Sequence, residues 1–180
     1  MIARFVLLLL ARRRLTLAVV VVPTGASLAL AAVRVRPDFS VDAIVFLTST
    51  TYTGDLDGQT GADDKVKAQA AAAGLPGTYL GWISTSDPAS SPASRFNHST
   101  GGYARTDDLR LANDWADLTD GSIGNVLLDE NGLAPSAGSG QLAWTNTSSG
   151  GTATTATDTC SDWESMGAGS AFVGRPGARV

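Results

Sequence analysis

Cysteine and histidine, which supply most zinc ligands and many catalytic groups, are nearly absent: the 180 residues contain one of each. A structural zinc site takes four ligands of these types, so one of each is too few. A Ser-His-Asp triad would need His98 and a serine from a loop. Neither a Gly-x-Ser-x-Gly elbow nor a Gly-x-x-x-x-Gly-Lys loop occurs. We therefore expect no enzyme and no catalytic residues, with a hydrolase built on His98 and a loop serine as the alternative.

Basic residues are scarce beyond the N-terminal segment. That segment holds Arg4, Arg12, Arg13 and Arg14, and without them nine basic residues face 17 acidic ones, a net charge of about −8. Nucleic-acid binding needs lysine and arginine clustered opposite the phosphates. The charge therefore argues against nucleic acid as a partner and is typical of an acidic secreted protein.

No acidic residue precedes Asp38, and the first part of the chain is basic and apolar. Arg14 is followed by an apolar run at residues 15–22, and Ala29 and Ala31 put small side chains at the two positions that a signal peptidase reads. Residues 1–32 are therefore predicted to be a secretory signal peptide, cleaved after Ala31 or Ala32, or a membrane anchor. No cysteine lies near this site, which argues against a lipid anchor.

The anchor alternative rests on residues 15–33, which are long enough to span a bilayer although Pro23 and Gly25 interrupt them. A third alternative places the true start later, with Arg12 to Arg14 as the basic end of the signal. Each alternative predicts an extracytoplasmic protein, secreted or in the cell envelope. It would contact a membrane only if the segment is retained, and residues 33–42 are predicted to be a linker.

Residues 43–165 are predicted to form one α+β domain, with one main helix, short irregular antiparallel strands and long loops. Apolar, β-branched and aromatic runs predict strands at 44–52, 75–84 and 142–145. Residues 60–73 predict the main helix, with Thr60 as its cap, Asp63 completing a capping box, and Gly74 ending it. Residues 115–118 predict one helical turn. Residues 166–180 are predicted to be an irregular tail.

Acidic pairs are the remaining candidates for ligand binding. Asp129, Glu130 and Asn131 carry the oxygen ligands that calcium prefers, although the proline that accompanies them in calcium-dependent sugar sites is missing. They are the candidate ligand-binding residues, and calcium is the candidate ion of a protein expected to need no cofactor. A solvated turn is the plainer interpretation. The tryptophans lie in apolar segments and are predicted to be buried in the core: Trp82, Trp115, Trp144 and Trp163.

The block at residues 61–79, continued by Trp82-Ile83-Ser84, resembles the opening helix and strand of the bacterial endostatin-like domain family. Further similar stretches lie at 115–121, 128–132, 142–145 and 160–163, so the resemblance covers residues 43–165. It implies a C-type-lectin-like fold and a secreted or cell-surface binding module without enzymatic activity. The implied ligand is an extracellular protein, a matrix component or a carbohydrate.

The cysteines depart from the family pattern. Family members carry a cysteine on the first helix, where this chain has Val66, and two more near the end, which are missing here. The resemblance implies that the helix cysteine pairs with the last one, and the cysteine matched by Cys160 with the third. Cys160 is therefore predicted to be an unpaired thiol, and the loss of both bridges predicts marginal stability. The tail does not resemble a closing strand, so the domain is expected to be C-terminally truncated, with a non-functional fragment as a further alternative.

Overall fold

The computed structural model describes residues 4–10, 41–135, 142–165 and 170–174. Its helical and strand elements follow in chain order: β1 (Arg4–Leu10), β2 (Val41–Leu47), α1 (Gly58–Ala72), β3 (Thr78–Gly81), the 3-10 turn η1 (Pro88–Ser90), α2 (Pro92–Arg95), β4 (Gly102–Ala104), β5 (Arg110–Ala112), α3 (Trp115–Leu118), β6 (Ala143–Trp144), α4 (Cys160–Trp163) and β7 (Val173–Gly174). Within these ranges α1 is the one long helix and the strands are short, which confirms the predicted α+β class.

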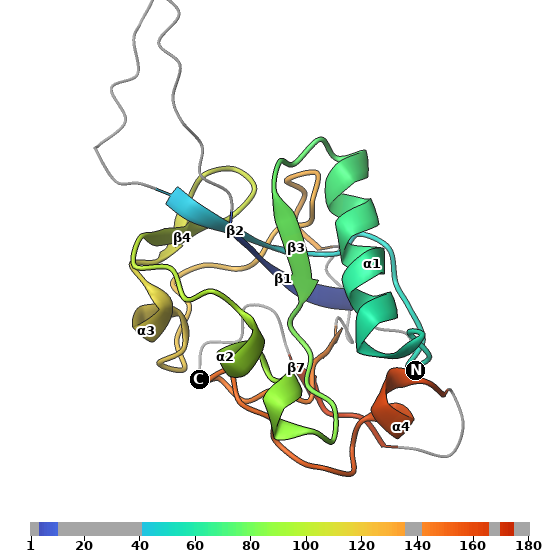
Figure 1. Ribbon diagram of the computed structural model, residues 1–180. Helices are drawn as coiled ribbons and strands as arrows, with labels where there is room; N and C mark the ends of the chain where they lie inside the picture. Colours follow the sequence, from blue (N-terminus) through green and yellow to red (C-terminus); the bar gives the residue numbers. More distant parts are fainter. Residues whose placement is uncertain (1–3, 11–40, 136–141, 166–169, 175–180) are drawn as a thin grey trace, which may run out of the picture.

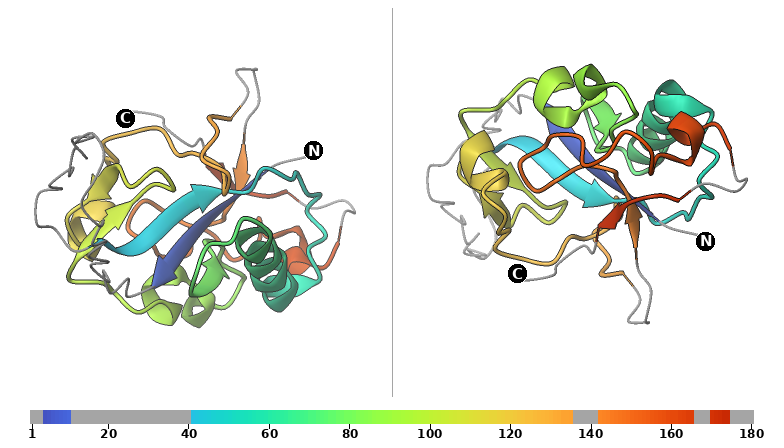
Figure 2. Two further views of the ribbon diagram at one scale, coloured as in Figure 1. Left: turned by 90° about the horizontal axis from the view of Figure 1, so that it is seen from above. Right: turned by 90° about the horizontal axis from the view of Figure 1, so that it is seen from below.

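The strands form one mixed sheet with the order β5-β4-β2-β1-β6-β7, and β3 also pairs with β1. β1 runs antiparallel to β2 and β3, whereas it runs parallel to β6, and β2 runs parallel to β4. β1 and β2 lie side by side in the middle of the molecule, and α1 lies beside β3 (Figures 1 and 2). The prediction of antiparallel strands is therefore wrong for two of the pairings.

β2 separates two hydrophobic cores. Ile44 and Phe46 belong to the core that contains α1, whereas Val45 and Leu47 belong to the core around β4 and β5. Successive side chains of a strand point to opposite faces of the sheet, so alternate residues enter different cores. The continuous apolar run of this segment follows because both faces of β2 are covered.

α1 ends as predicted but begins differently. Gly74 has a φ of +69°, and its amide bonds to the carbonyl oxygen of Ala71 at 3.0 Å, which closes the last turn of the helix. At the other end the cap residue is Asp57, in the left-handed conformation and without a side-chain cap, while Thr60 lies inside the helix. The predicted capping box is therefore wrong, since Asp63 is buried and bonds to β3 instead.

β1 lies within the segment that the sequence predicted to be a signal peptide or anchor. Arg4–Leu10 is a strand paired with β2 over three residues and with β3 over four. An apolar run suits a signal and a central strand equally, because both need consecutive apolar residues. No helix in the described part of the chain is long and apolar enough to cross a membrane. The predicted cleavage site at Ala31 or Ala32 lies outside the described residues, and the last two residues of the predicted linker already belong to β2.

The tail contains a short strand where irregular structure was predicted. Val173–Gly174 pairs antiparallel with β6, and Thr159 forms an isolated bridge with Ala171. A two-residue strand is stabilised by pairing with its neighbour. It is too short to show an alternating pattern in the sequence, so it could not be predicted from periodicity.

Candidate functional site

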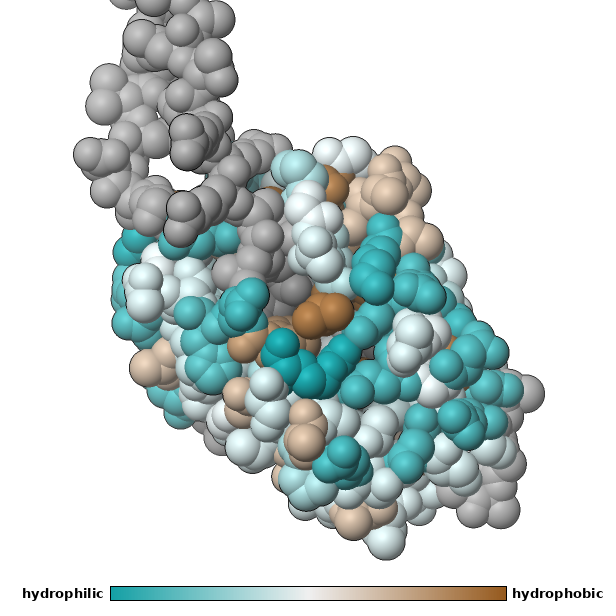
Figure 3. Space-filling view, in the orientation of Figure 1, coloured by the Kyte–Doolittle hydropathy of each residue, from teal (hydrophilic) through white to brown (hydrophobic). Residues whose placement is uncertain are grey.

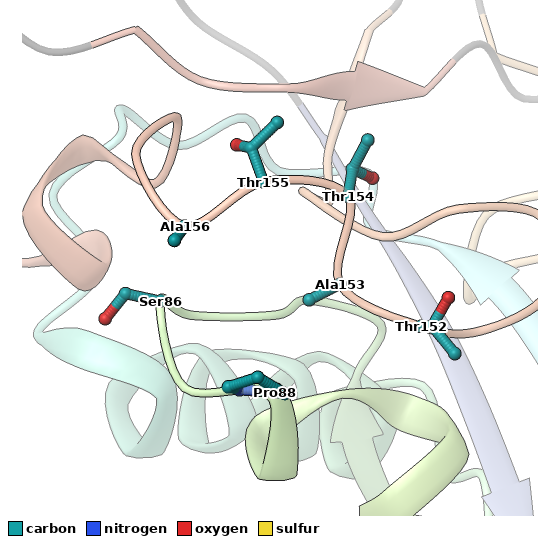
Figure 4. A pocket seen from close by; sticks show the side chains of 7 residues that line it. All are labelled: Ser86, Pro88, Thr152, Ala153, Thr154, Thr155 and Ala156. Carbon is teal, nitrogen blue, oxygen red and sulfur yellow. The ribbon is translucent and has the colours of Figure 1, made fainter.

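A pocket of about 240 Å³ opens where two distant parts of the chain meet. Ser86 and Pro88 form one side of it and residues 152–156 form the other (Figure 4). Ser86, Thr152, Thr154 and Thr155 contribute hydroxyl groups, and the remaining lining residues are proline and alanine. Hydroxyl groups both donate and accept hydrogen bonds, so the lining offers polar contacts beside carbon surface. None of these lining side chains titrates in the ordinary pH range.

Hydrogen bonds to Asp162 hold the Ser86 side of the pocket in place. The Ser86 amide donates to Asp162 Oδ1 at 2.6 Å, and the Ser86 hydroxyl donates to Asp162 Oδ2 at 2.7 Å. Partial burial raises the pKa of Asp162, but the hydrogen bonds from Ser86 outweigh it and hold that pKa below its ordinary value. Asp162 is therefore a fully charged clamp at neutral pH, and its two oxygens fix both the backbone and the side chain of Ser86.

Asp162 reaches Ser86 from a left-handed turn. The four residues of α4, Cys160–Trp163, have φ values of 48°, 56°, 57° and 69°. This conformation costs an L-residue about 1–2 kcal/mol. Trp163 compensates by donating from its indole to the carbonyl oxygen of Ser84 at 2.9 Å, and it is fully buried. A strained segment of this kind persists only where its surroundings hold it, and here it orients the clamp.

The other side of the pocket is fastened by the buried side chain of Asn146. Asn146 Nδ2 donates to the carbonyl oxygen of Thr155 at 2.9 Å, and Oδ1 accepts from the Thr155 amide at 3.3 Å. The same Nδ2 lies 3.4 Å from the carbonyl oxygen of Ser84, which precedes the first side of the pocket. One amide side chain thus joins both sides, so the pocket is held open in a defined shape before any ligand enters.

Asp129, Glu130 and Asn131 lie in a separate turn and do not line the pocket. Asp129 Oδ1 accepts from the amides of Asn131 at 2.9 Å and Leu133 at 2.8 Å. Glu130 accepts from the Ser49 amide at 2.8 Å and from the Ser49 hydroxyl. Only 7% of Asp129 and 5% of Glu130 is exposed. Both carboxylates are used to close the turn and join it to the segment after β2, and the ligand role of the three residues stays a prediction.

Across the described ranges, no three histidine, cysteine, aspartate or glutamate side chains gather as a possible metal site. Among the described residues, the structure therefore shows no group of side chains that could bind the calcium ion suggested by the sequence. Asp162 and Asp158 each accept a hydrogen bond from a hydroxyl group of the pocket lining.

Cys160 is a free thiol and belongs to the same hydrophobic core as Val66. Burial raises the pKa of the Cys160 thiol. A methyl group added at Gly54 would lie 2.6 Å from Cys160 Sγ, so this glycine provides the room for the sulfur. The protonated, enclosed thiol is suited to packing and poorly suited to nucleophilic attack.

His98 belongs to an aromatic cluster. Its ring stacks on Trp115 with centroids 4.0 Å apart and planes 4° apart. Its Nε2 lies 3.0 Å from the carbonyl oxygen of Ala93. A ring nitrogen that faces a carbonyl oxygen must carry a proton to bond there, so this nitrogen cannot accept one from a serine. The geometry gives the hydrolase alternative no support.

The aromatic cluster also corrects the prediction that every tryptophan is buried. Trp144 and Trp163 are core residues as predicted, whereas Trp82 and Trp115 are only half-buried. Trp115 lies 5.5 Å from Trp82, centroid to centroid, and a Cβ added at Gly151 would lie 3.0 Å from its ring. Gly151 directly precedes the pocket segment, so the cluster and the pocket are neighbours. Local sequence could not show this, because the two parts are distant in the chain.

Exposed large apolar side chains are few in the described part of the chain: Leu109, Val126, Leu133 and Phe172. The face seen in Figure 3 is mainly hydrophilic, with a small hydrophobic area in a hollow near its centre.

No protein-family model matches the chain, and no curated protein is detectably similar to it. The resemblance to endostatin-like domains therefore stays a prediction, and the site has to be interpreted from its own geometry.

Proposed function

We propose that the chain is a secreted or cell-surface binding module without enzymatic activity, built on a C-type-lectin-like, endostatin-like domain. Its ligand is an extracellular protein, a matrix component or a glycan. The observation that carries the proposal is the pocket lined by Ser86, Pro88 and residues 152–156. The location outside the cytoplasm rests on the pattern of residues 1–32 and not on the pocket.

The chemistry of the pocket favours recognition of a small neutral polar group. Hydroxyl donors and acceptors match the hydroxyl groups of a sugar or the amide groups of a polar side chain. Pro88 and the two alanines offer carbon surface for the apolar face of such a group. The volume of about 240 Å³ lies below the roughly 300–1,000 Å³ typical of pockets for drug-sized ligands, so one sugar ring or one side chain suits it.

The rigidity of the pocket also favours binding. Asp162 and Asn146 fix the two sides through hydrogen bonds that exist without ligand. A site that is already ordered loses little conformational entropy on binding. The pocket lining contains no histidine, cysteine or carboxylate side chain, since its side chains are hydroxyls, methyl groups and a proline ring. This supports a role in binding over a role in hydrolysis.

The proposal is tested by filling the pocket. Ala156 lines it and is exposed, so Ala156→Trp should occupy it without entering a core, and the exposed Ala68 of α1 allows Ala68→Trp as the matched control. Isothermal titration calorimetry would measure binding to neutral mono- and oligosaccharides and to purified matrix proteins. We expect a ligand of the wild-type chain to bind at least about tenfold more weakly to Ala156→Trp and equally to Ala68→Trp. Equal affinity for all three proteins would contradict the proposal.

A further inference from the structure

β1 makes backbone pairings on both of its edges. Leu8 is opposite Val45 of β2 and also opposite Leu80 of β3. Phe5 is opposite Trp144 of β6. Leu8 therefore has a partner on each side, which is the situation of a residue in an interior strand.

The other strands do not form one sheet without β1. In the described pairing, β3 is joined to the sheet by β1 alone, and β6 with β7 reaches β2 only across β1. Removing β1 would leave the β5-β4-β2 ladder, the β6-β7 pair and a separate β3. The facing edges of β2 and β3 would then expose rows of unpaired N–H and C=O groups, which bind another strand readily. We call the space between β2, β3 and β6 the strand slot.

The strand slot borders residues on which the rest of the fold depends. Tyr79 of β3 and Trp144 of β6 are both buried in the core that contains α1. The amide of Gly81, at the end of β3, donates to Asp63 of α1 at 2.7 Å. An empty slot would therefore loosen a central part of the domain and not its periphery.

All three export hypotheses remove β1 from the strand slot, since a later start would leave Arg4–Leu10 out of the protein. Cleavage after Ala31 or Ala32 would separate Arg4–Leu10 from β2. A single span at residues 15–33 would put β1 and β2 on opposite sides of a bilayer, where their backbones could not pair. A molecule whose sheet contains β1 therefore has neither been cut there nor been threaded there through a membrane.

We propose that the strand slot is a strand-binding site whose occupant is Arg4–Leu10 of the same chain, and that the folded protein keeps this segment. The antiparallel register places the end of β1 and the beginning of β2 at the same end of the pair. Residues 11–40 connect these ends, and this length far exceeds the two to five residues that most β-hairpins use. A connection of this length is more than enough to join the two ends, and it keeps the strand at a high local concentration. The inference is independent of what the pocket binds. It replaces the export role proposed for residues 1–32, because a chain that keeps β1 in its sheet has not used that segment as a cleaved signal or a membrane span.

The first test is hydrogen exchange on the folded protein purified from cells that express the full-length sequence, read by mass spectrometry together with its intact mass. We expect an uncut chain in which the amides of Arg4–Leu10 and Thr78–Gly81 exchange at least about 100-fold more slowly than an unstructured peptide. The proposal is overturned if the folded protein begins after residue 31. It is equally overturned if Thr78–Gly81 is protected while Arg4–Leu10 exchanges as an unstructured peptide does.

The second test uses a pair of proline variants of the full chain. Leu8→Pro removes a backbone donor from a strand that is paired on both edges, whereas Leu17→Pro makes the same change in the other apolar run. We expect Leu8→Pro to raise the exchange rate of Thr78–Gly81 at least about tenfold, or to prevent folding, and Leu17→Pro to leave that rate unchanged. Equal effects of the two variants would contradict a structural role of β1.

Discussion

Asp63 and Asp162 each hold a nearby backbone amide through one carboxylate oxygen, and the two amides lie close together in the chain. Their surroundings nevertheless shift the two pKa values in opposite directions. Asp63 accepts a hydrogen bond from the Gly81 amide at the end of β3, and Asp162 accepts one from the Ser86 amide just beyond it. In each case the second carboxylate oxygen accepts from a side chain, which is Arg95 for Asp63 and the Ser86 hydroxyl for Asp162.

Burial decides between the two. Asp63 is buried, and desolvation raises its pKa although the Gly81 amide and the Arg95 guanidinium lower it. Asp162 is only half-buried, so the smaller desolvation is outweighed by the bonds from Ser86 and its pKa falls. The comparison teaches that a count of hydrogen bonds does not give the direction of a pKa shift, because the cost of removing water can exceed their sum.

The largest change in the free energy of unfolding is expected from replacing the buried Asp63. Asp63→Ala removes the partner of Arg95, whose side chain is only 17% exposed, and leaves a charged group buried without compensation. Such losses cost about 3–5 kcal/mol of unfolding free energy. Urea unfolding at neutral pH would measure the change. Asp64→Ala, next to it on the exposed side of α1, serves as the control and should change stability by less than about 0.5 kcal/mol.

Replacing the half-buried Asp162 is expected to change the free energy of unfolding by less than replacing Asp63, and in a way that depends on pH. The folded-state pKa of Asp162 lies below 3.8, so its stabilisation is present above pH 3.8 and is lost as the pH falls through the folded-state value. Asp63, with a raised pKa, behaves oppositely, because ionisation of its buried carboxyl lowers stability as the pH rises from 3.8 through the folded-state value. The cost of Asp63→Ala at neutral pH is separate, since it comes from leaving Arg95 without its partner. Asp162→Asn should therefore cost about 1 kcal/mol at pH 7 and progressively less in acid. Urea unfolding of wild type and variant at several pH values would measure this, and a constant difference would show that the charge of Asp162 is not involved.

The helix and its neighbourhood could be predicted because their signals are local. An alanine-rich run ended by Gly74 predicted residues 60–73, and α1 spans Gly58–Ala72. Trp115–Leu118 is the predicted helical turn, with Asp114 accepting from the Asp117 amide as its cap. Helix propensity and capping depend on residues within one or two turns, so a sequence contains all the information they need.

The two clamps could not be predicted, because each one depends on residues far away in the chain. The sequence placed Asp63 in a capping box, since a capping box is a local pattern and the true partners, Gly81 and Arg95, are not in its vicinity. Asp162 likewise gave no signal of its bond to Ser86. Buried polar groups take whatever partner the tertiary structure brings to them, and that partner leaves no periodicity in the sequence.

The left-handed turn that carries Asp162 was missed for a different reason. Turns with positive φ are recognised by glycine, or by asparagine and aspartate at single positions, and Cys160–Trp163 contains no glycine. The conformation is held by tertiary contacts such as the bond from the Leu56 amide to the Trp163 carbonyl oxygen at 2.7 Å. The backbone conformation of this turn therefore conflicts with the conformational preference of its residues. The conflict lies next to the pocket, and conflicts of this kind are expected at functional sites.

The smallest change in stability is expected from a substitution at Ser161, which tests directly whether the left-handed turn is strained. Ser161 is exposed and has φ 56° and ψ 52°, so Ser161→Gly removes the penalty of an L-residue in this region, about 1–2 kcal/mol, at the cost of more freedom in the unfolded chain. A net stabilisation of about 0.5 kcal/mol is expected, measured by urea unfolding. Ser94→Gly, at an exposed position of the short helix α2, should instead destabilise the protein by about 0.5–1 kcal/mol. If both variants lower stability alike, the turn is not strained at Ser161, and the orientation of Asp162 must be held by some other feature.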